Sequence, residues 1–158
     1  ERIRGFVDHN RDVLLMSSAE ALDPRTIAEN RLLRCVNSAF QVDLLGQVNA
    51  ETVGGFQAAG VGGQLDFFRG AALREDAATI IVLDSTTSDG SVSRIVPELG
   101  TGAVVTSTRY DIDYVITEYG VAQMRGRTTK ERAQELIGIA HPSFREELER
   151  AAREMLLL

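Results

Sequence analysis

The chain has 158 residues, enough for one domain with a buried core, and its 44% apolar and 25% charged residues are average for a globular protein. The formal net charge of −6 argues against nucleic acid as a partner, because phosphate binding favours a basic surface. A single cysteine, Cys35, excludes a disulfide within the chain and a metal site built from thiolates, and no run of about 18 apolar residues predicts a membrane helix.

The first residues have neither a starting Met nor the apolar centre of a signal peptide, so we expect a cytoplasmic protein and a chain that is a piece of a larger one. Residues 1–158 are interpreted as one domain. Residues 2–12 suit a short amphipathic helix, and the apolar run 13–16 is typical of a buried strand. Asp23 followed by Pro24 predicts a helix start, with Asp as the N-cap. A strand is expected over 33–40, and an extended segment follows up to Gly46.

The most unusual stretch is a glycine loop, Gly60-Val61-Gly62-Gly63, followed by a predicted helix over 65–74. Backbone N–H groups at such a helix start are suited to a phosphate, a carboxylate or a developing oxyanion. A plain tight turn between a strand and a helix explains the same residues equally well. The spacing matches neither a phosphate-binding P-loop nor a dinucleotide-binding fingerprint, so it predicts no nucleotide site.

The second half alternates strands and helices. Residues 79–83 are a continuous apolar run of the kind that fills a sheet covered on both faces, and 92–96 are expected to pair with it through a turn at Asp89-Gly90. Further strands are predicted at 103–107 and 114–117, and helices at 129–140, capped by Thr128 and Glu131, and at 143–156. This order predicts an α/β fold: an open mixed or mostly parallel sheet that contains 33–38, 79–84 and 103–107, flanked by helices.

Few side chains are candidates for chemistry. Glu118 follows an apolar strand, where ligands bind in open α/β sheets, although a structural carboxylate is the commoner reason for such a residue. Asn37 and Asn49 lie in strand-like runs, either near a ligand or bonded to the backbone. His141 is expected to hydrogen-bond carbonyls at a helix end, and Cys35 to act as a small buried hydrophobe. No metal site is predicted.

Several segments, in the same order along nearly the whole chain, resemble the C-terminal region of the acetyl-CoA hydrolase/transferase family, the family I CoA transferases of the 4-hydroxybutyrate CoA-transferase-like group. The segments are VNSAFQVDLLGQVNAE (36–51), GVGGQLDF (60–67), SRIVP (93–97), VITEYGVA (115–122), ERA (131–133) and IAHPSFR (139–145).

The resemblance implies an open α/β domain of the CoA-transferase (NagB/RpiA-like) type, the second of two similar halves. It also implies a glutamate nucleophile that attacks an acyl-CoA thioester and then carries CoA to a small carboxylate, and this glutamate is expected upstream of residue 1. The oxyanion and CoA-proximal role falls on Gly60, flanked by Val61, Gly62 and Gly63.

Asn37 and Asn49 are expected to contact acyl-CoA, and Glu118 is expected to support the site. Coenzyme A is a substrate here, and no permanently bound cofactor is expected. The implied partners are the N-terminal half of the same enzyme and further copies in a homo-oligomer, with no nucleic acid and no membrane. Two alternatives remain open: an acyl-CoA hydrolase, and a CoA-binding module without chemistry of its own.

Overall fold

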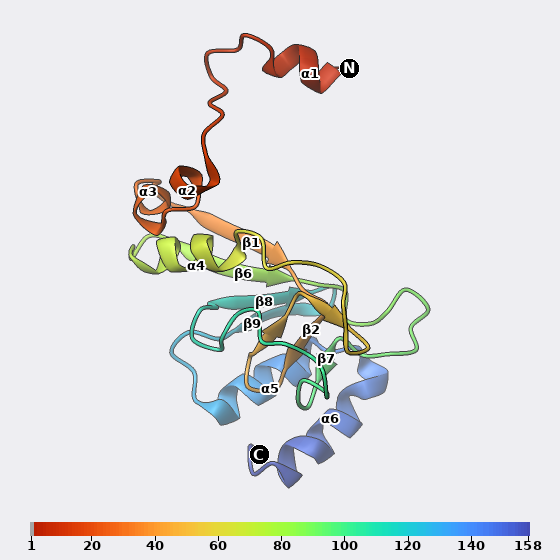
Figure 1. Cartoon of the computed structure of the whole chain (residues 1–158). Coiled ribbons are helices and arrows are strands. Elements are labelled where there is room, and N and C mark those ends of the chain that lie inside the picture. The colour runs from red at the N-terminus through yellow and green to blue at the C-terminus, as the bar shows by residue number, and fades with distance from the viewer. Residues whose placement is uncertain (1) are drawn as a thin grey trace.

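The computed structural model describes residues 2–158, which form a body of strands and helices with an N-terminal segment that projects from it (Figure 1). The helices are α1 (Arg2–Val7), α2 (Ser18–Ala21), α3 (Pro24–Ala28), α4 (Gln64–Ala72), α5 (Thr129–Ile139) and α6 (Pro142–Glu154). The strands are β1 (Arg34–Ser38), β2 (Gln41–Asp43), β3 (Val48–Asn49), β4 (Thr52–Val53), β5 (Phe56–Gln57), β6 (Ala78–Val82), β7 (Ile95–Val96), β8 (Tyr114–Thr117) and β9 (Gly120–Gln123).

The main sheet has four strands in the order β1-β6-β8-β9. β1, β6 and β8 are parallel, whereas β9 returns antiparallel to β8. This confirms the predicted α/β fold with a mixed sheet flanked by helices. Two smaller sheets, β3-β2-β7 and β4-β5, complete the strands.

One face of the main sheet is buried. In register across it lie Asn37, Ile81, Val115 and Ala122, and the last three are completely buried. Helix α4 packs against β1 and β6, and α5 packs against β8 and β9. The apolar side chains of these strands therefore form the core on this face.

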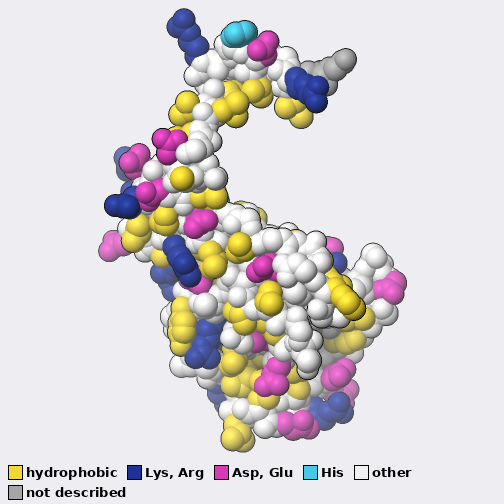
Figure 2. Space-filling view, viewed as in Figure 1, with side chains coloured by type: hydrophobic (Ala, Val, Ile, Leu, Met, Phe, Trp, Pro, Cys, Tyr) yellow, Lys and Arg dark blue, Asp and Glu magenta, His cyan; other side chains and the backbone are white. Residues whose placement is uncertain are grey.

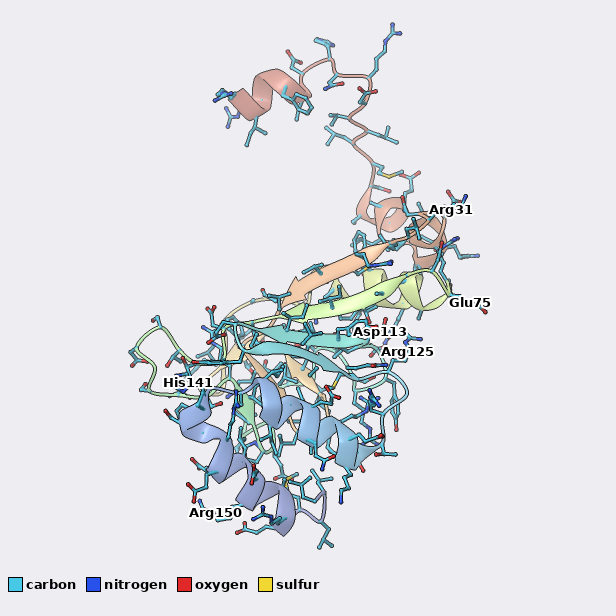
Figure 3. All side chains as sticks on the ribbon, turned by 180° about the vertical axis from the view of Figure 1, so that it is seen from behind. Arg31, Glu75, Asp113, Arg125, His141 and Arg150 are labelled. Atoms are coloured by element: carbon cyan, nitrogen blue, oxygen red, sulfur yellow. The ribbon has the colours of Figure 1, made fainter. Side chains whose placement is uncertain are left out.

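The opposite face of the sheet is largely uncovered within residues 2–158. Its side chains include Val36, Val82 and Val121, whose exposed fractions are 58%, 39% and 57%. Figure 3 views β1 and β6 from the side that faces away from α4, and no helix crosses them there. Apolar side chains at this exposure on a sheet face are typical of a surface that packs against another element.

Helix starts follow the local signals in the sequence. The Asp23 side chain accepts a hydrogen bond from the Arg25 N–H, and Pro24 is the first residue of α3. The Thr128 hydroxyl and the Glu131 carboxylate form the predicted reciprocal cap of α5. The predictions for α4, α5 and α6 are confirmed to within two residues at each end.

The prediction for the N-terminal segment was wrong. Residues 13–16 form no strand, and Leu14 and Leu15 are among the most exposed apolar side chains of the chain. Helix α1 ends at Val7, so it is also shorter than expected. Figure 2 shows hydrophobic side chains along this projecting segment. The prediction of burial is therefore wrong within residues 2–158, because no other part of this range covers the apolar side chains at 14–16.

Two strand predictions in the second half also need correction. Asp89-Gly90 does form a turn, with Thr86 bridged to Ser93, but β7 then leaves this hairpin and pairs in parallel with β2. Residues 103–107 form no strand, and their one bridge joins Ser107 to Val48 of β3. Both segments extend the small β3-β2-β7 sheet, so hydrogen-bonding partners far along the chain took precedence over the nearest strand.

Candidate functional site

A cavity of about 440 Å³ lies at the carboxyl ends of the parallel strands. The ends of β1, β6 and β8 supply its walls, together with the loops that follow them. The lining residues are Ser38, Ala39, Phe40, Ala50, Val82, Leu83, Asp84, Arg94, Ile116, Thr117 and Glu118. This is where open α/β sheets bind ligands, and the volume lies within the range of ligand pockets.

Glu118 is the sequence-predicted residue that lines this cavity. Its Oε1 accepts a 2.5 Å hydrogen bond from the Ser85 hydroxyl, and its Oε2 accepts one of 2.9 Å from the Ser85 N–H. The Ser85 hydroxyl, assisted by backbone N–H groups and by nearby His141, holds the pKa of Glu118 below its usual value despite partial desolvation. Glu118 is therefore a fixed, ionised carboxylate that ties the end of β8 to the loop after β6.

His141 lies beside this site. The sequence predicted that it would hydrogen-bond carbonyls at the end of a helix, but it caps the start of α6. Its Nδ1 accepts a hydrogen bond of 3.3 Å from the Ser143 N–H, so it caps the start of α6 and does not hold the last carbonyls of α5. Its ring stands edge-on to Tyr119. In Figure 3 His141 lies at the carboxyl-end side of the sheet, while the ion pair of Asp113 and Arg125 lies at the other end.

The glycine loop lies at the same edge of the sheet, because α4 starts there and runs back to the beginning of β6 (Figure 1). The N–H groups of residues 60–63 donate no hydrogen bond to any residue of 2–158. Gly60 is exposed and has open space where a Cβ would lie, and Gly62 has a φ of 56°. Residues 60–63 do not line the 440 Å³ cavity, so the structure places the loop and Glu118 at one edge without direct contact.

Asn37 and Asn49 differ in how far their side-chain amides are already hydrogen-bonded within the protein. Asn37 lies on the face that α4 covers, and its side chain is half-buried without a hydrogen bond to residues 2–158. Asn49 is 1% exposed and holds a turn: its Nδ2 donates to the Thr52 carbonyl, and its Oδ1 accepts from the N–H groups of Glu51 and Thr52. A ligand could reach the Asn49 amide only by breaking these bonds. Asn37 therefore has the freer side chain.

Cys35 is 4% exposed, and its Sγ lies 3.4 Å from the Phe67 carbonyl oxygen. Burial raises the pKa of the Cys35 thiol, which agrees with the predicted role of a small buried hydrophobe.

Three polar residues of the site were not predicted from the sequence. Asp84 and Ser85 follow β6 directly, as Glu118 follows β8, so the rule that placed Glu118 at a strand end applies to them as well. Arg94 carried no local signal. It reaches the cavity because β7 pairs with β2, and that pairing was not predicted.

Residues 2–158 contain neither a cluster of metal ligands nor a helix that could span a membrane. No three His, Cys, Asp or Glu side chains in this range gather closely enough to hold a metal ion. The helices in this range are each too short or too polar to cross a bilayer.

Comparison with known proteins identifies relatives that match nearly the whole chain. The chain is 48% identical over 148 residues to a 4-hydroxybutyrate coenzyme A transferase of Clostridium kluyveri, covering 94% of this chain and 34% of that protein. It is 48% identical over 154 residues to a succinyl-CoA:cyclohexane-1-carboxylate CoA transferase of Geobacter metallireducens, covering 98% and 35%. The crystal structure of RipA from Yersinia pestis superposes with a TM-score of 0.91 at 36% identity, over 99% of this chain and 35% of RipA.

The chain thus spans about a third of the length of the curated relatives it matches. The family model described as "Acetyl-CoA hydrolase/transferase C-terminal domain" matches residues 1–152. The chain therefore belongs to the acetyl-CoA hydrolase/transferase family and corresponds to the C-terminal domain of that family.

Proposed function

We propose that this chain is the C-terminal part of an acyl-CoA:carboxylate CoA-transferase that works through a glutamyl-CoA thioester. Relatives that are 48% identical carry CoA transferase names, and both names describe acids or acyl-CoA compounds as substrates. The observation that carries the proposal is the cavity at the carboxyl ends of β1, β6 and β8, with Glu118 fixed in its wall.

Glu118 is poorly suited to be the nucleophile. Both of its oxygens accept hydrogen bonds from Ser85, and its lowered pKa makes it a weaker base than an ordinary glutamate. A nucleophilic carboxylate needs a free oxygen within reach of the thioester carbonyl. We therefore assign Glu118 a positioning role, and we place the nucleophilic glutamate in the part of the enzyme upstream of this chain.

We propose the following covalent steps for the transfer of CoA. The glutamate attacks the acyl-CoA carbonyl and expels CoA thiolate, which forms an acyl-glutamyl anhydride. The thiolate then attacks the glutamyl carbonyl, so that the first acid leaves and a glutamyl-CoA thioester remains. A second carboxylate repeats these steps in reverse and departs as its CoA thioester.

Each addition in this sequence creates an oxyanion, and N–H groups without another partner stabilise such a charge. The N–H groups of Gly60, Val61, Gly62 and Gly63 meet that requirement. The half-buried amide of Asn37 is the next candidate for a contact with acyl-CoA. Asn49 contributes through the turn that it holds next to Ala50, a lining residue of the cavity.

The uncovered sheet face supports a partner for this chain. Val82 belongs both to that face and to the cavity wall, so an element packed over the face also closes the cavity. We assign this face to the N-terminal half of the same enzyme, which would bring the nucleophile to the cavity. The exposed apolar side chains of the projecting segment, Leu14 and Leu15 among them, suit contacts between copies in a homo-oligomer.

The test is an assay of the full-length enzyme with acetyl-CoA, with and without a carboxylate acceptor such as butyrate. A transferase consumes acetyl-CoA only when the acceptor is present and forms the acceptor's CoA thioester. Equal consumption without acceptor assigns the enzyme as an acyl-CoA hydrolase, the second function that the family includes.

The purified 158-residue chain is the matched control, and it should show no turnover above background. Turnover by this chain alone, abolished by Glu118→Gln, would place the nucleophile at Glu118 and contradict the proposal. If the full-length protein binds acyl-CoA but shows no turnover, it is a CoA-binding module without chemistry of its own.

A further inference from the structure

Arg94 lies between two cavities. It lines the 440 Å³ cavity at the strand ends and also a second cavity of about 360 Å³. Phe40 lines both cavities as well, so the two spaces are adjacent. The second cavity is walled largely by apolar groups and hydroxyls, among them Val53, Val92 and Thr87.

The backbone of Arg94 is held firmly while its side chain is not. The Arg94 N–H donates to the Ser85 carbonyl at 2.8 Å, and the Arg94 carbonyl accepts from the Val42 N–H at 2.9 Å. The guanidinium makes no ion pair or hydrogen bond with any residue of 2–158, although the residue is half-buried. The half-buried guanidinium of Arg74, by contrast, pairs with Asp76 at 2.6 Å.

Because the Arg94 guanidinium lines both cavities and has no partner among residues 2–158, its N–H groups are free to donate to an anion there. The other charged lining residues of the first cavity are the carboxylates Asp84 and Glu118. A carboxylate substrate that entered would be repelled by both of them. Arg94 supplies the one positive charge among the lining residues of either cavity, so it is the group able to hold such a substrate.

We infer that Arg94 binds the carboxylate of the short-chain acid that accepts CoA, with the acid's carbon chain in the cavity lined by Phe40, Val53 and Val92. This inference rests on the proposed transferase function. A guanidinium N–H that donates to one oxygen of the carboxylate orients the acid and leaves its other oxygen free to attack the glutamyl-CoA thioester. One cation beside two carboxylates leaves a net charge of −1, so a singly charged acid is repelled less here than a CoA phosphate with up to two negative charges.

The test compares Arg94→Gln and Arg94→Lys in the full-length enzyme. Loss of a charge-assisted hydrogen bond should raise KM for butyrate about 10- to 100-fold in Arg94→Gln, and Arg94→Lys should recover part of the loss. KM for acetyl-CoA and the formation of the enzyme–CoA thioester from acetyl-CoA alone, followed by mass spectrometry, should change by less than about threefold. Arg150→Gln, an equal charge change on an exposed residue of α6 far from the cavity, is the control (Figure 3).

A KM for butyrate within twofold of the wild-type value in Arg94→Gln would overturn the inference. A rise in KM for acetyl-CoA in its place would assign Arg94 to a CoA phosphate and overturn it as well. If the wild-type enzyme transfers no CoA, the proposed function fails, and calorimetric titration with butyrate then tests the site by itself. Binding by the wild type that Arg94→Gln abolishes sustains the anion site, and equal binding by both proteins overturns it.

Discussion

At the scale of single residues, the contact between Ser85 and Glu118 offers a direct measurement. We predict that Ser85→Ala raises the pKa of Glu118 toward that of an ordinary glutamate, because the Ser85 hydroxyl is the main group that stabilises the ionised form. Titration of the carboxyl carbon by NMR gives this pKa. Ser88→Ala, which alters an exposed hydroxyl in the following turn, should leave it unchanged.

The same contact has a pH signature in stability. Glu118 has a lowered pKa in the folded protein, so its bonds to Ser85 contribute stability at neutral pH, and this contribution disappears as the pH falls through that pKa. The difference in free energy of unfolding between wild type and Ser85→Ala should therefore shrink on acidification. A difference that stays constant from neutral pH to below the Glu118 pKa measured by NMR would show that the carboxylate is not involved.

Substitutions in the glycine loop (residues 60–63) can distinguish a catalytic role of the loop from a purely conformational one. Gly60 has no positive φ and no neighbour within 4 Å of a built Cβ, so Gly60→Val should leave thermal unfolding of the full-length enzyme unchanged. If the N–H groups of the loop stabilise the oxyanion, kcat should fall on the order of 10²- to 10³-fold, because the side chain displaces them from the thioester.

Gly62 provides the contrast. Its φ of 56° makes Gly62→Ala strained, and we expect a loss of roughly 1–2 kcal/mol in the free energy of unfolding. If Gly60→Val melts far earlier while its folded fraction turns over normally, the loop is structural and its assignment to the site is wrong.

At the scale of elements, the C-terminal half of α4 is positioned by its crossing with α3. A Cβ on Gly70 would lie 2.6 Å from Ile27 Cγ2 and 2.9 Å from the Pro24 carbonyl oxygen, so the two helices approach as closely as a glycine allows. We predict that Gly70→Ala lowers the free energy of unfolding by about 1–3 kcal/mol, as measured by urea denaturation, because the helices must separate.

Gly138 is the matched control within α5. It is exposed and has no atom within 4 Å of a built Cβ, so Gly138→Ala should stabilise the protein by about 0.5–1 kcal/mol through helix propensity alone. If Gly70→Ala is also stabilising, the close approach of α3 and α4 does not determine the position of α4.

At the scale of the whole molecule, the uncovered sheet face predicts where the rest of the enzyme packs. Val121→Lys should leave the unfolding of the isolated 158-residue chain unchanged, because this side chain is already exposed. In the full-length enzyme the same change should cost more than about 1 kcal/mol, since it buries an unpaired charge. Thermal unfolding of both proteins provides the comparison.

Leu73→Lys tests whether the effect is specific to that face. Leu73 is similarly exposed but follows α4, which lies over the buried face of the sheet, so the change should be silent in both proteins. Equal effects of Val121→Lys in the isolated chain and in the full-length enzyme would mean that nothing covers the sheet face.

The sequence by itself determined the features whose interacting groups lie close together in the chain. Asp23 and Arg25, or Thr128 and Glu131, are two or three residues apart, so helix starts could be recognised before any tertiary contact was known. The continuous β-branched run at 79–83 likewise identified the central strand, although within residues 2–158 only its alternate residues Thr79, Ile81 and Leu83 are buried and the predicted cover on both faces is not seen. The ordered motifs, the GVGG loop among them, were sufficient to recognise the family.

Only the tertiary structure decided which distant segments meet. Ser85 and Glu118 are 33 residues apart, and β7 pairs with β2, about 50 residues earlier, in preference to the strand beside it in the chain. The apolar run at 13–16 shows the same limit, since its pattern predicted a buried strand and the residues are exposed and form no strand. Strand pairing depends on how all segments close and pack together, and no local pattern of residues contains that information.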